Sequence, residues 1–428
     1  MSEFILELYS EEIPPSLQIN ARNELKEKFK SLLIEESLNF GSLTVYSSPT
    51  RITILLKDFS EKIKIPTREI RGPKVGVIDD IVNNFLKAHQ SSRKDLMEKQ
   101  NDKGNFYYIK TKAKEVFTGE ILKKIVVNSI ASIKWKKSMR WADTDLLWGR
   151  PLRSILAIYN GKVLTFNYGH LKSSDTIFIE KDLKVQSKKV KSFKDYQKLL
   201  MVNNIILDHN DREKRIIKKF ENFFKIKNFN NYYDSKLLEE VTNIVEDPHV
   251  LLVDFDKKYL ELPKEVIIST LQNHQRYFPI FDKKDEIKNF FLVVVNKKDI
   301  NNIIKDGNKR VVEARLSDAK FFWDKDKSKN LIKQIASLKD IKFYEGLGSI
   351  FDKTQRLRKL SGMLADDLNL NKEKVEMAAS ISKSDLCSDL VSEYPDLQGL
   401  MGKYFALSQG FEEDVSNAVS DHYLPIGI

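Results

Sequence analysis

The sequence predicts a multidomain α+β protein, in which mixed helices and strands precede a helical C-terminal part. Its 428 residues exceed one ordinary hydrophobic core, because a domain usually holds about 100–200 residues. Hydrophobic residues make up 41% and charged residues 31% of the chain, a balance typical of globular proteins. Strand patterns alternate with helical patterns up to about residue 300 and then stop. We therefore predict an N-terminal α+β region (1–180), a charged helical seam (181–235), a compact α+β unit (236–325) and a helical domain (326–428).

The N-terminal region begins with a strand over residues 3–9, which Pro14 and Pro15 separate from a long amphipathic helix. One face of this helix is apolar, with Leu17, Ala21, Leu25, Phe29 and Leu32. Two short strands follow on either side of a Ser-Pro turn within residues 44–59, and RGP at 71–73 ends the run.

Residues 79–137 are expected to form a helix, a hairpin turned at Lys103-Gly104 and a second helix from about Thr118. Asn160-Gly161 predicts a tight hairpin, because both residues tolerate the positive φ angles of that turn. The seam that follows is rich in Lys, Asn and Asp, and we expect one charged helix in it, near 211–225.

The unit after the seam combines a strand in HVLLVDF, a helix from Pro263 to about Asn273 and a strand in FFLVVVN. Beyond about residue 302 only helical spacing remains. It predicts three helices, marked by Val312, Leu316, Ala319 and Trp323, by Leu357, Leu360, Leu364 and Leu368, and by Val375, Ala379, Leu386 and Leu390.

The charge balance favours a polyanionic partner. The 72 basic and 61 acidic residues leave a net charge of +11, which suits nucleic acid. Lysine is also abundant in any protein from an AT-rich genome, so this alternative stays open. No apolar run approaches the ~18 residues that cross a bilayer, and the N-terminus lacks the basic start of a signal peptide. The lone Cys387 cannot form an internal disulfide, so we expect a cytoplasmic protein.

Three stretches combine basic and aromatic residues. In QNHQRYFPIF (272–281), Pro279 predicts an edge strand that leaves Arg276 and Tyr277 at a rim, where they could hold phosphates and stack on bases. The alternative is that the aromatic rings pack the core while His274 and Arg276 cap the preceding helix.

In GNKRVVEARLSDAKFF (307–322), Lys309, Arg310 and Arg315 surround the apolar stripe. Cations are usually disfavoured at a helix start, so Lys309 and Arg310 could be held there for a ligand. The alternative is a solvated face with ion pairs such as Glu313 with Arg310. In residues 134–153, Arg140, Trp141 and Arg150 belong to a basic stretch with three of the four tryptophans, which suits RNA, a subunit interface or simply a core.

Motifs of catalysis are absent from the sequence. It has no Gly-x-x-x-x-Gly-Lys loop, no Gly-x-Gly-x-x-Gly fingerprint and no Gly-x-Ser-x-Gly elbow. The six histidines show no metal-ligand spacing, and we expect neither a metal nor a catalytic residue. Asp385 and Asp389, four residues apart on a predicted helix, could offer paired carboxylates to a cation, although capping or surface roles are the commoner use.

Nine stretches, in order, resemble the beta subunit of bacterial heterotetrameric glycyl-tRNA synthetase. They are SEEIPP (10–15), PTRI (49–52), RGP (71–73), MRW (139–141), GRP (149–151), HQRYFP (274–279), GNKRVVEARLSDAKFF (307–322), KSDLCSDLV (383–391) and DLQGLMGKYFA (396–406). The resemblance implies that this chain binds tRNA(Gly) and an alpha subunit in an α2β2 assembly. It implies that the alpha subunit uses ATP and Mg²⁺ to form glycyl-adenylate, and that this chain binds no cofactor, DNA or membrane.

The resemblance also implies a B3/B4-like unit around HQRYFP and an HD-like helical domain, in which KSDL replaces the His-Asp of a metal-dependent phosphohydrolase. GHLKSSDTIF (169–178) departs from the family's Gly-His-Arg-Phe stretch, and the C-terminal part of the family, including the anticodon-binding domain, is expected to be lacking. A stand-alone RNA-binding protein and an HD-type phosphohydrolase are the alternatives. The expected tRNA contacts are Arg140, Trp141, Arg150, Arg276, Tyr277, Lys309, Arg310 and Arg315.

Overall fold

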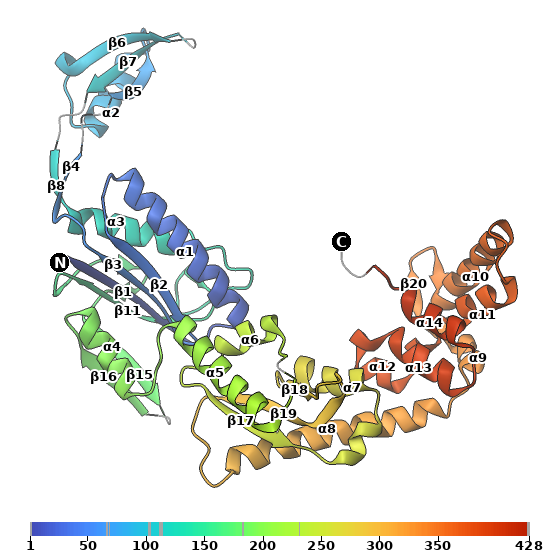
Figure 1. Ribbon diagram of the computed structural model, residues 1–428. Helices are drawn as coiled ribbons and strands as arrows, with labels where there is room; N and C mark the ends of the chain where they lie inside the picture. The colour runs from blue at the N-terminus through green and yellow to red at the C-terminus, as the bar shows by residue number, and fades with distance from the viewer. Residues whose placement is uncertain are drawn as a thin grey trace. The chain divides into compact units, whose positions relative to one another are not determined.

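The computed structural model describes residues 2–65, 67, 69–101, 104–110, 114–181, 184–230 and 232–425 (Figure 1). The chain forms two compact units. Unit 1 comprises residues 1–212 with 243–246, and unit 2 comprises residues 213–242 with 247–428. The division falls at Arg212, inside the segment 181–235 that the sequence predicts as a seam. The α+β class with a helical C-terminal region is confirmed.

Unit 1 is built on a five-stranded antiparallel sheet in the order β12-β11-β1-β3-β2. Its strands are β1 (Glu3–Ser10), β2 (Ser42–Ser48), β3 (Arg51–Lys57), β11 (Leu152–Tyr159) and β12 (Lys162–Val163). The central strand β1 is buried on both faces. Successive side chains of a strand point to opposite sides, so β1 contributes to two cores. Phe4, Leu6 and Leu8 pack with the helices α1 (Pro15–Glu35) and α3 (Thr118–Ala131). Ile5 packs on the other side with Tyr196 and Leu200 of α4 (Phe193–Val202).

The hairpin predicted at Asn160-Gly161 is confirmed, since the turn joins β11 to β12. The two residues have φ angles of +47° and +78°, in the left-handed region that Asn and Gly adopt most readily. The strand at 3–9, the long helix after Pro15 and the strand pair around the Ser48-Pro49 turn are confirmed as well.

A small insert of unit 1 carries its own core of Val82, Leu86 and Ile109. It contains α2 (Asp79–Ala88), the 3-10 turn η1 (Arg93–Asp95) and a sheet in the order β5-β7-β6, with β5 (Glu69–Lys74), β6 (Leu96–Asn101) and β7 (Gly104–Lys110). The pair β4 (Lys62–Ile65) and β8 (Lys114–Phe117) leads into and out of it. The predicted pairing of β6 with β7 is confirmed, while Lys103 of its turn lies outside the described residues.

Three short strand pairs complete unit 1. They are β9 (Met139–Arg140) with β10 (Leu147–Trp148), β13 (Asn167–Tyr168) with β14 (Leu171–Lys172), and β15 (Thr176–Lys181) with β16 (Lys184–Lys189).

Unit 2 contains an antiparallel sheet in the order β17-β19-β18, with β17 (His249–Asp254), β18 (Phe278–Phe281) and β19 (Ile287–Val295). Leu292 of β19 packs against α5 (His209–Lys227) and α6 (Ser235–Thr242). Phe291 and Val293 face the opposite core, together with α7 (Lys264–Ser269) and α8 (Ile303–Lys327). The prediction that Pro279 lies on an edge strand is confirmed, because β18 pairs with β19 alone in the described part of the chain.

The rest of unit 2 is helical (Figure 1). Its α-helices are α9 (Leu331–Gln334), α10 (Ile350–Asp367), α11 (Lys372–Ile381), α12 (Asp389–Glu393), α13 (Leu400–Ser408) and α14 (Glu413–Asp421). Its 3-10 turns are η4 (Ile335–Asp340), η5 (Ser384–Cys387) and η6 (Pro395–Leu397), and the 3-10 turn η2 (Lys257–Glu261) follows β17. No helix among the described residues combines the length and the apolarity that crossing a bilayer requires.

Two local predictions about this region need correction. A short hairpin of β20 (Lys342–Tyr344) and β21 (Gly348–Ser349) interrupts the helices. The helix predicted from Leu357, Leu360, Leu364 and Leu368 is confirmed as α10, although Leu360, Leu364 and the C-cap Leu368 are exposed while Gly362 and Ala365 are buried. The third predicted helix is in fact α11, η5 and α12, since Ser388 caps a new helix and its Oγ accepts a hydrogen bond from Val391 N.

Candidate nucleic-acid interface

The tryptophans of residues 134–153 are largely core material. Trp148 is fully buried, and Trp135 packs against it with ring centroids 4.8 Å apart. Trp135 also covers Gly149, where a Cβ would lie 2.5 Å from its ring, so only glycine fits there. Trp141 is half-buried and makes an edge contact with His170. Of the alternatives for this stretch, the structure supports core packing for all three tryptophans, since Trp135 and Trp141 both pack against the core that contains Trp148.

The arginines of the same stretch differ in exposure. Arg140 lies on β9 with an exposed side chain, and its guanidinium is 3.3 Å from Asp145. Arg150 is half-buried and donates a hydrogen bond of 2.8 Å to the carbonyl of Gly149. Both head groups belong to unit 1. A surface pair such as Arg140–Asp145 stabilises little and can open to a phosphate at small cost.

Tyr277 does not lie on the rim that the sequence predicts. It is 9% exposed, its ring stacks on Phe291 at 5.0 Å, and its hydroxyl donates to Asn308. Burial raises the pKa of this phenol. The ring is therefore occupied by the core and by α8, which corrects the expectation that it stacks on a base.

Arg276, by contrast, is exposed and follows the π-helical turn η3 (Thr270–His274). Its φ of +58° lies in the left-handed region and turns the chain from that helix into β18. The guanidinium Nε donates a hydrogen bond of 2.6 Å to Glu240. The alternative is that Arg276 caps the preceding helix. Its backbone N–H does donate a hydrogen bond to the helix carbonyl Gln272 O, while its side chain bonds to Glu240.

The helix α8 begins at Ile303, earlier than the sequence indicates. The Asp299 carboxylate accepts hydrogen bonds from the amides of Ile304 and Lys305 and so satisfies the helix start. Lys309 and Arg310 consequently lie beyond the first turn, where the helix dipole no longer disfavours cations. The prediction that they lie at a helix start is wrong, so their position gives no argument that a ligand holds them there.

Most cations of α8 are paired with acids from other elements. Lys309 lies 2.6 Å from Asp254 of β17, and this hydrogen bond raises the pKa of Lys309 and lowers that of Asp254. Arg315 lies 3.5 Å from Glu393 of α12. Arg310 is exposed and has no ion pair among the described residues, so of the three expected contacts on α8 it is the one freest to meet a phosphate.

Asp385 and Asp389, which the sequence offers as paired carboxylates, have different partners in the structure. Asp385 is buried in η5, and its Oδ2 accepts hydrogen bonds from the amides of Gly399 and Gly402, at 2.5 and 3.1 Å. Asp389 starts α12 and pairs with Lys325 and Lys329. Capping and ion pairing therefore account for both residues. Within the described ranges, no three His, Cys, Asp or Glu residues gather as metal ligands would.

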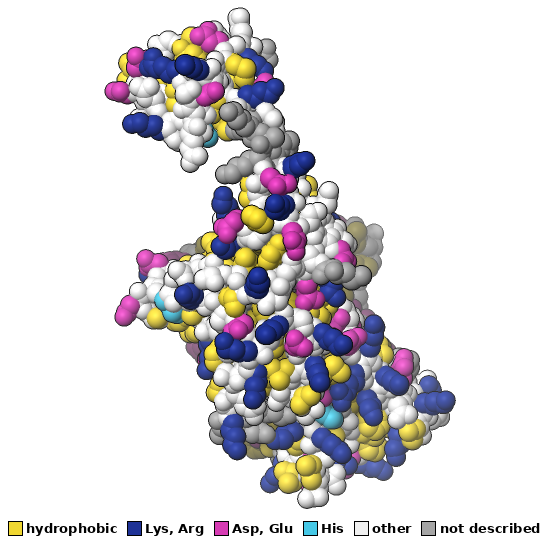
Figure 2. All heavy atoms as spheres, turned by 90° about the vertical axis from the view of Figure 1, so that its left-hand side faces the viewer, with side chains coloured by type: hydrophobic (Ala, Val, Ile, Leu, Met, Phe, Trp, Pro, Cys, Tyr) yellow, Lys and Arg dark blue, Asp and Glu magenta, His cyan; other side chains and the backbone are white. Residues whose placement is uncertain are grey.

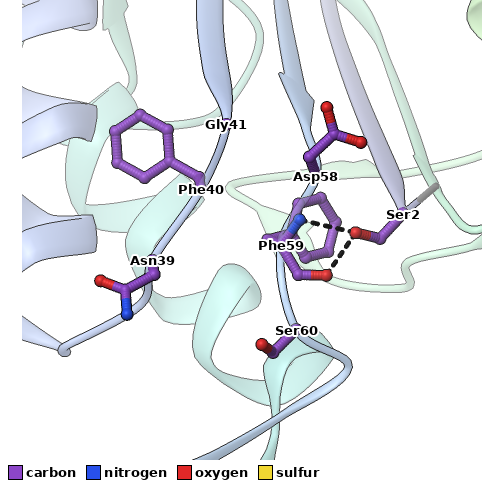
Figure 3. A pocket seen from close by; sticks show the side chains of 7 residues that line it. All are labelled: Ser2, Asn39, Phe40, Gly41, Asp58, Phe59 and Ser60. Atoms are coloured by element: carbon purple, nitrogen blue, oxygen red, sulfur yellow. Dashed lines mark hydrogen bonds between the residues drawn. The ribbon is translucent and has the colours of Figure 1, made fainter.

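A hollow of about 560 Å³ lies at the edge of the unit 1 sheet (Figure 3). Its wall includes Asn39, Phe40 and Asp58, and Ser2 ties the two strands beside it by bonding to both backbone groups of Phe59. Asp58 is the only charged side chain among its lining residues. A phosphate would be repelled there, so the hollow is no part of the candidate interface.

A lysine-rich surface of unit 1 was missed among the expected contacts. It comprises six exposed side chains of β16 and α4 and the segment between them, Lys184, Lys188, Lys189, Lys191, Lys194 and Lys198. Only Lys189 of these has an ion pair in the described part of the chain, at 3.4 Å from Asp175. Figure 2 views the side on which α4, β15 and β16 lie and shows Lys and Arg side chains gathered over its lower half. The signal was the density of lysine between 184 and 198.

Comparison with known proteins relates this arrangement to one family. A sequence model described as glycyl-tRNA synthetase beta subunit matches residues 4–428, almost the whole chain. The chain belongs to the glycyl-tRNA synthetase beta subunit family. Similar proteins include the glycine–tRNA ligase beta subunits of Rickettsia prowazekii, 38% identical over 429 residues, of Rickettsia typhi, 37% over 431, and of Rickettsia felis, 37% over 432.

The three matches to this family cover all of the present chain but 64% of each Rickettsia protein. Within the chain, the family resemblance falls on structurally defined places. HQRYFP (274–279) spans the end of the π-helical turn and the start of the edge strand, and GNKRVVEARLSDAKFF (307–322) lies inside α8. KSDLCSDLV (383–391) forms η5 and the start of α12. In this member of the family, the three stretches therefore contribute residues both to the core of unit 2 and to its surface.

Proposed function

We propose that this chain acts as the beta subunit of a glycine–tRNA ligase in the cytoplasm, where it binds tRNA(Gly) and positions it for aminoacylation. The adenylate chemistry, with its ATP and Mg²⁺, belongs in this proposal to an alpha subunit that joins the chain in an α2β2 assembly. The observation that carries the proposal is the family match over residues 4–428. The subunit named in that match implies an alpha partner.

The lysine surface of unit 1 supports RNA binding. Five of its six ammonium groups have no acidic partner among the described residues, so they would lose no ion pair on meeting a phosphate. Each phosphate that a lysine neutralises releases condensed counterions, which makes such binding favourable and strongly dependent on salt. Arg140, Arg276 and Arg310 would add contacts that set the register of the tRNA without reading its sequence.

A glycylation assay tests the proposal directly. The class II alpha chain is supplied with tRNA(Gly), glycine and ATP, with and without this polypeptide, and the glycyl-tRNA formed is measured. We expect a large stimulation of the rate by this chain and co-purification of the two polypeptides. If the chain neither stimulates glycylation nor binds the alpha chain, the proposed function is refuted.

A further inference from the structure

A second cavity, of about 450 Å³, lies within the helical part of unit 2. It is formed by α10, α11 and the end of α14, which pack against one another (Figure 1). Leu357, Val375 and three alanines make an apolar wall, and Lys353, Lys383 and His422 are its ionisable side chains. Its volume lies in the range of about 300–1,000 Å³ typical of small-molecule sites.

The cavity is electropositive, since no Asp or Glu is among the residues that line it. Lys353 Nζ lies 4.2 Å from the ring centroid of Phe343, and Lys383 Nζ lies 3.7 Å from that of Tyr423. Neither ammonium has a hydrogen bond or an ion pair in the described part of the chain. Lys372 and Lys374 of α11 differ in this respect, because both pair with carboxylates. The two cavity lysines thus keep their charge available for a ligand.

Lys383 is the more unusual of the two, because its side chain is buried and only 8% of the residue is exposed. Burial, followed by repulsion from Lys353, lowers the pKa of Lys383 to about 8, and attraction to Asp385 offsets part of this effect. Burial and the Lys383 charge also lower the pKa of His422. Asp385 Oδ2 accepts hydrogen bonds from two backbone amides, and among the described residues the Asp385 carboxylate is not within ion-pair distance of Lys383 Nζ. A buried cation without an ion pair is costly, and Asp385 compensates only part of that cost, so the cavity favours the entry of an anion.

We propose that this cavity binds a small phosphomonoester with a planar apolar body, of the size of a nucleoside monophosphate. Lys353 and Lys383 hold the phosphate, and the planar body lies against Leu357 and Val375. Lysine is a common phosphate ligand, and its charge supplies the compensation that the unliganded cavity lacks. None of its lining residues is an expected tRNA contact, and the proposal does not depend on the proposed function.

Calorimetric titration of the full chain with AMP, adenosine and inorganic phosphate tests the proposal. We expect one AMP per chain, bound about tenfold or more tightly than adenosine or phosphate alone. The reason is that the cavity contacts both parts of AMP, the phosphate through its lysines and the base through its apolar wall. Lys353→Met and Lys383→Met should each weaken AMP binding about tenfold. Lys359→Met, which removes an exposed charge of α10 outside the cavity, serves as the matched control and should bind AMP like the wild type.

Thermal unfolding separates a ligand-binding lysine from a structural one. Lys383→Met removes a buried charge that has no ion pair among the described residues, so we expect the unliganded variant to melt at a higher temperature than the wild type, although it binds AMP less well. A structural lysine would show the opposite sign on replacement. A lower melting temperature combined with unchanged AMP affinity would overturn the proposal.

A labelling experiment on the wild-type chain avoids any loss of folding. Pyridoxal 5′-phosphate carries a phosphate, a planar ring and an aldehyde, and at pH 8 its aldehyde carbon joins Lys383 Nζ as an imine with loss of water. Borohydride then supplies hydride to give a stable secondary amine, which peptide mass spectrometry locates. We expect preferential labelling of Lys383 and protection by AMP. Lack of AMP binding, or displacement of AMP by an RNA trinucleotide that binds more tightly, would overturn the proposal and, in the second case, assign the cavity to an RNA end.

Discussion

At the scale of residues, the chain distinguishes cations that hold the fold from cations that remain available. Lys309, Arg315 and Arg276 each pair with an acid that is 36 to 78 positions away in sequence. Arg310 has no such partner among the described residues, although it neighbours Lys309 on α8. Residue type and sequence position were predictable, whereas availability depends on acids from β17, α6 and α12 that only the fold brings close.

Replacing Arg310 tests this distinction. Arg310→Met should weaken tRNA binding and lower the slope of log K against log salt by about 1, because one phosphate contact is lost. The control is Lys320→Met on the same helix, whose ammonium pairs with Glu261 and Asp324. It should leave the slope unchanged. Filter binding of labelled tRNA at several salt concentrations measures both, and equal slopes for the two variants would contradict the assignment.

The buried pair Glu7–Arg51 in the unit 1 sheet carries a second residue-scale prediction. The two groups lie 3.2 Å apart with almost no exposure, and Tyr196 donates a hydrogen bond to the same carboxylate. Burial raises the pKa of Glu7, while Arg51 opposes that rise. Arg51→Met should therefore destabilise the fold by about 3–5 kcal/mol at pH 8, since it leaves a buried charge unpaired.

The pH dependence of this loss has a defined sign. A carboxyl whose folded pKa is raised binds its proton more tightly in the folded state than in the unfolded state. Arg51→Met removes the guanidinium that opposes this rise, so the folded pKa of Glu7 is higher in the variant than in the wild type. Acidification therefore favours the fold of the variant more than that of the wild type. The deficit of Arg51→Met should thus shrink between pH 8 and pH 5 in urea unfolding. The double variant Glu7→Gln/Arg51→Met should recover much of the stability at pH 8, and a deficit that is equal at both pH values would contradict this account.

At the scale of elements, apolar spacing predicted where helices lie better than where they end. The four residues Val375, Ala379, Leu386 and Leu390 fit one continuous helix, yet the chain breaks between Ile381 and Asp389. Ser388 Oγ donates to Asp385 O and accepts from Val391 N, and the buried Asp385 carboxylate accepts from Gly399 N; such local side-chain bonds compete with helix continuation. The spacing of apolar residues alone does not register this competition.

The two aspartates of that break should differ in their effect on stability. Asp385→Ala should cost about 1–3 kcal/mol, because the amides of Gly399 and Gly402 at the start of α13 lose a buried acceptor. Asp389→Ala should cost about 0–1 kcal/mol, because its partners Lys325 and Lys329 are partly exposed. Chemical unfolding of both variants measures the difference, and a larger loss for Asp389→Ala would reverse the assignment of roles.

At the scale of the whole molecule, net charge and its distribution are separate properties. The excess of +11 follows from composition, and it is compatible with RNA binding or with lysine abundance alone. Five of the six lysines on the surface of β16 and α4 lack an acidic partner among the described residues. Most cations of α8, in contrast, form ion pairs with acidic residues of the same chain. The distribution therefore favours RNA binding over a merely solvated surface.

Charge reversal on α4 tests whether distribution or total charge controls binding. Lys194→Glu/Lys198→Glu should weaken tRNA binding and lower its salt slope by about 2. Lys26→Glu/Lys30→Glu changes two exposed residues of α1 at the same spacing and alters the net charge equally, so it should have a smaller effect. The same binding assay compares them. Equal losses would mean that total charge, and not this surface, governs affinity.

The sequence by itself determined the α+β class, the main strands and helices, the turn at Asn160-Gly161 and the resemblance that the family match confirms. These features rest on local spacing and on motifs that are continuous along the chain. Only the tertiary structure decided that Tyr277 is buried, that Asp385 caps α13, and that Arg310 and Lys383 lack a carboxylate partner within the described residues. The physical reason is that burial and charge pairing depend on neighbours distant in sequence, and folding alone brings them within contact.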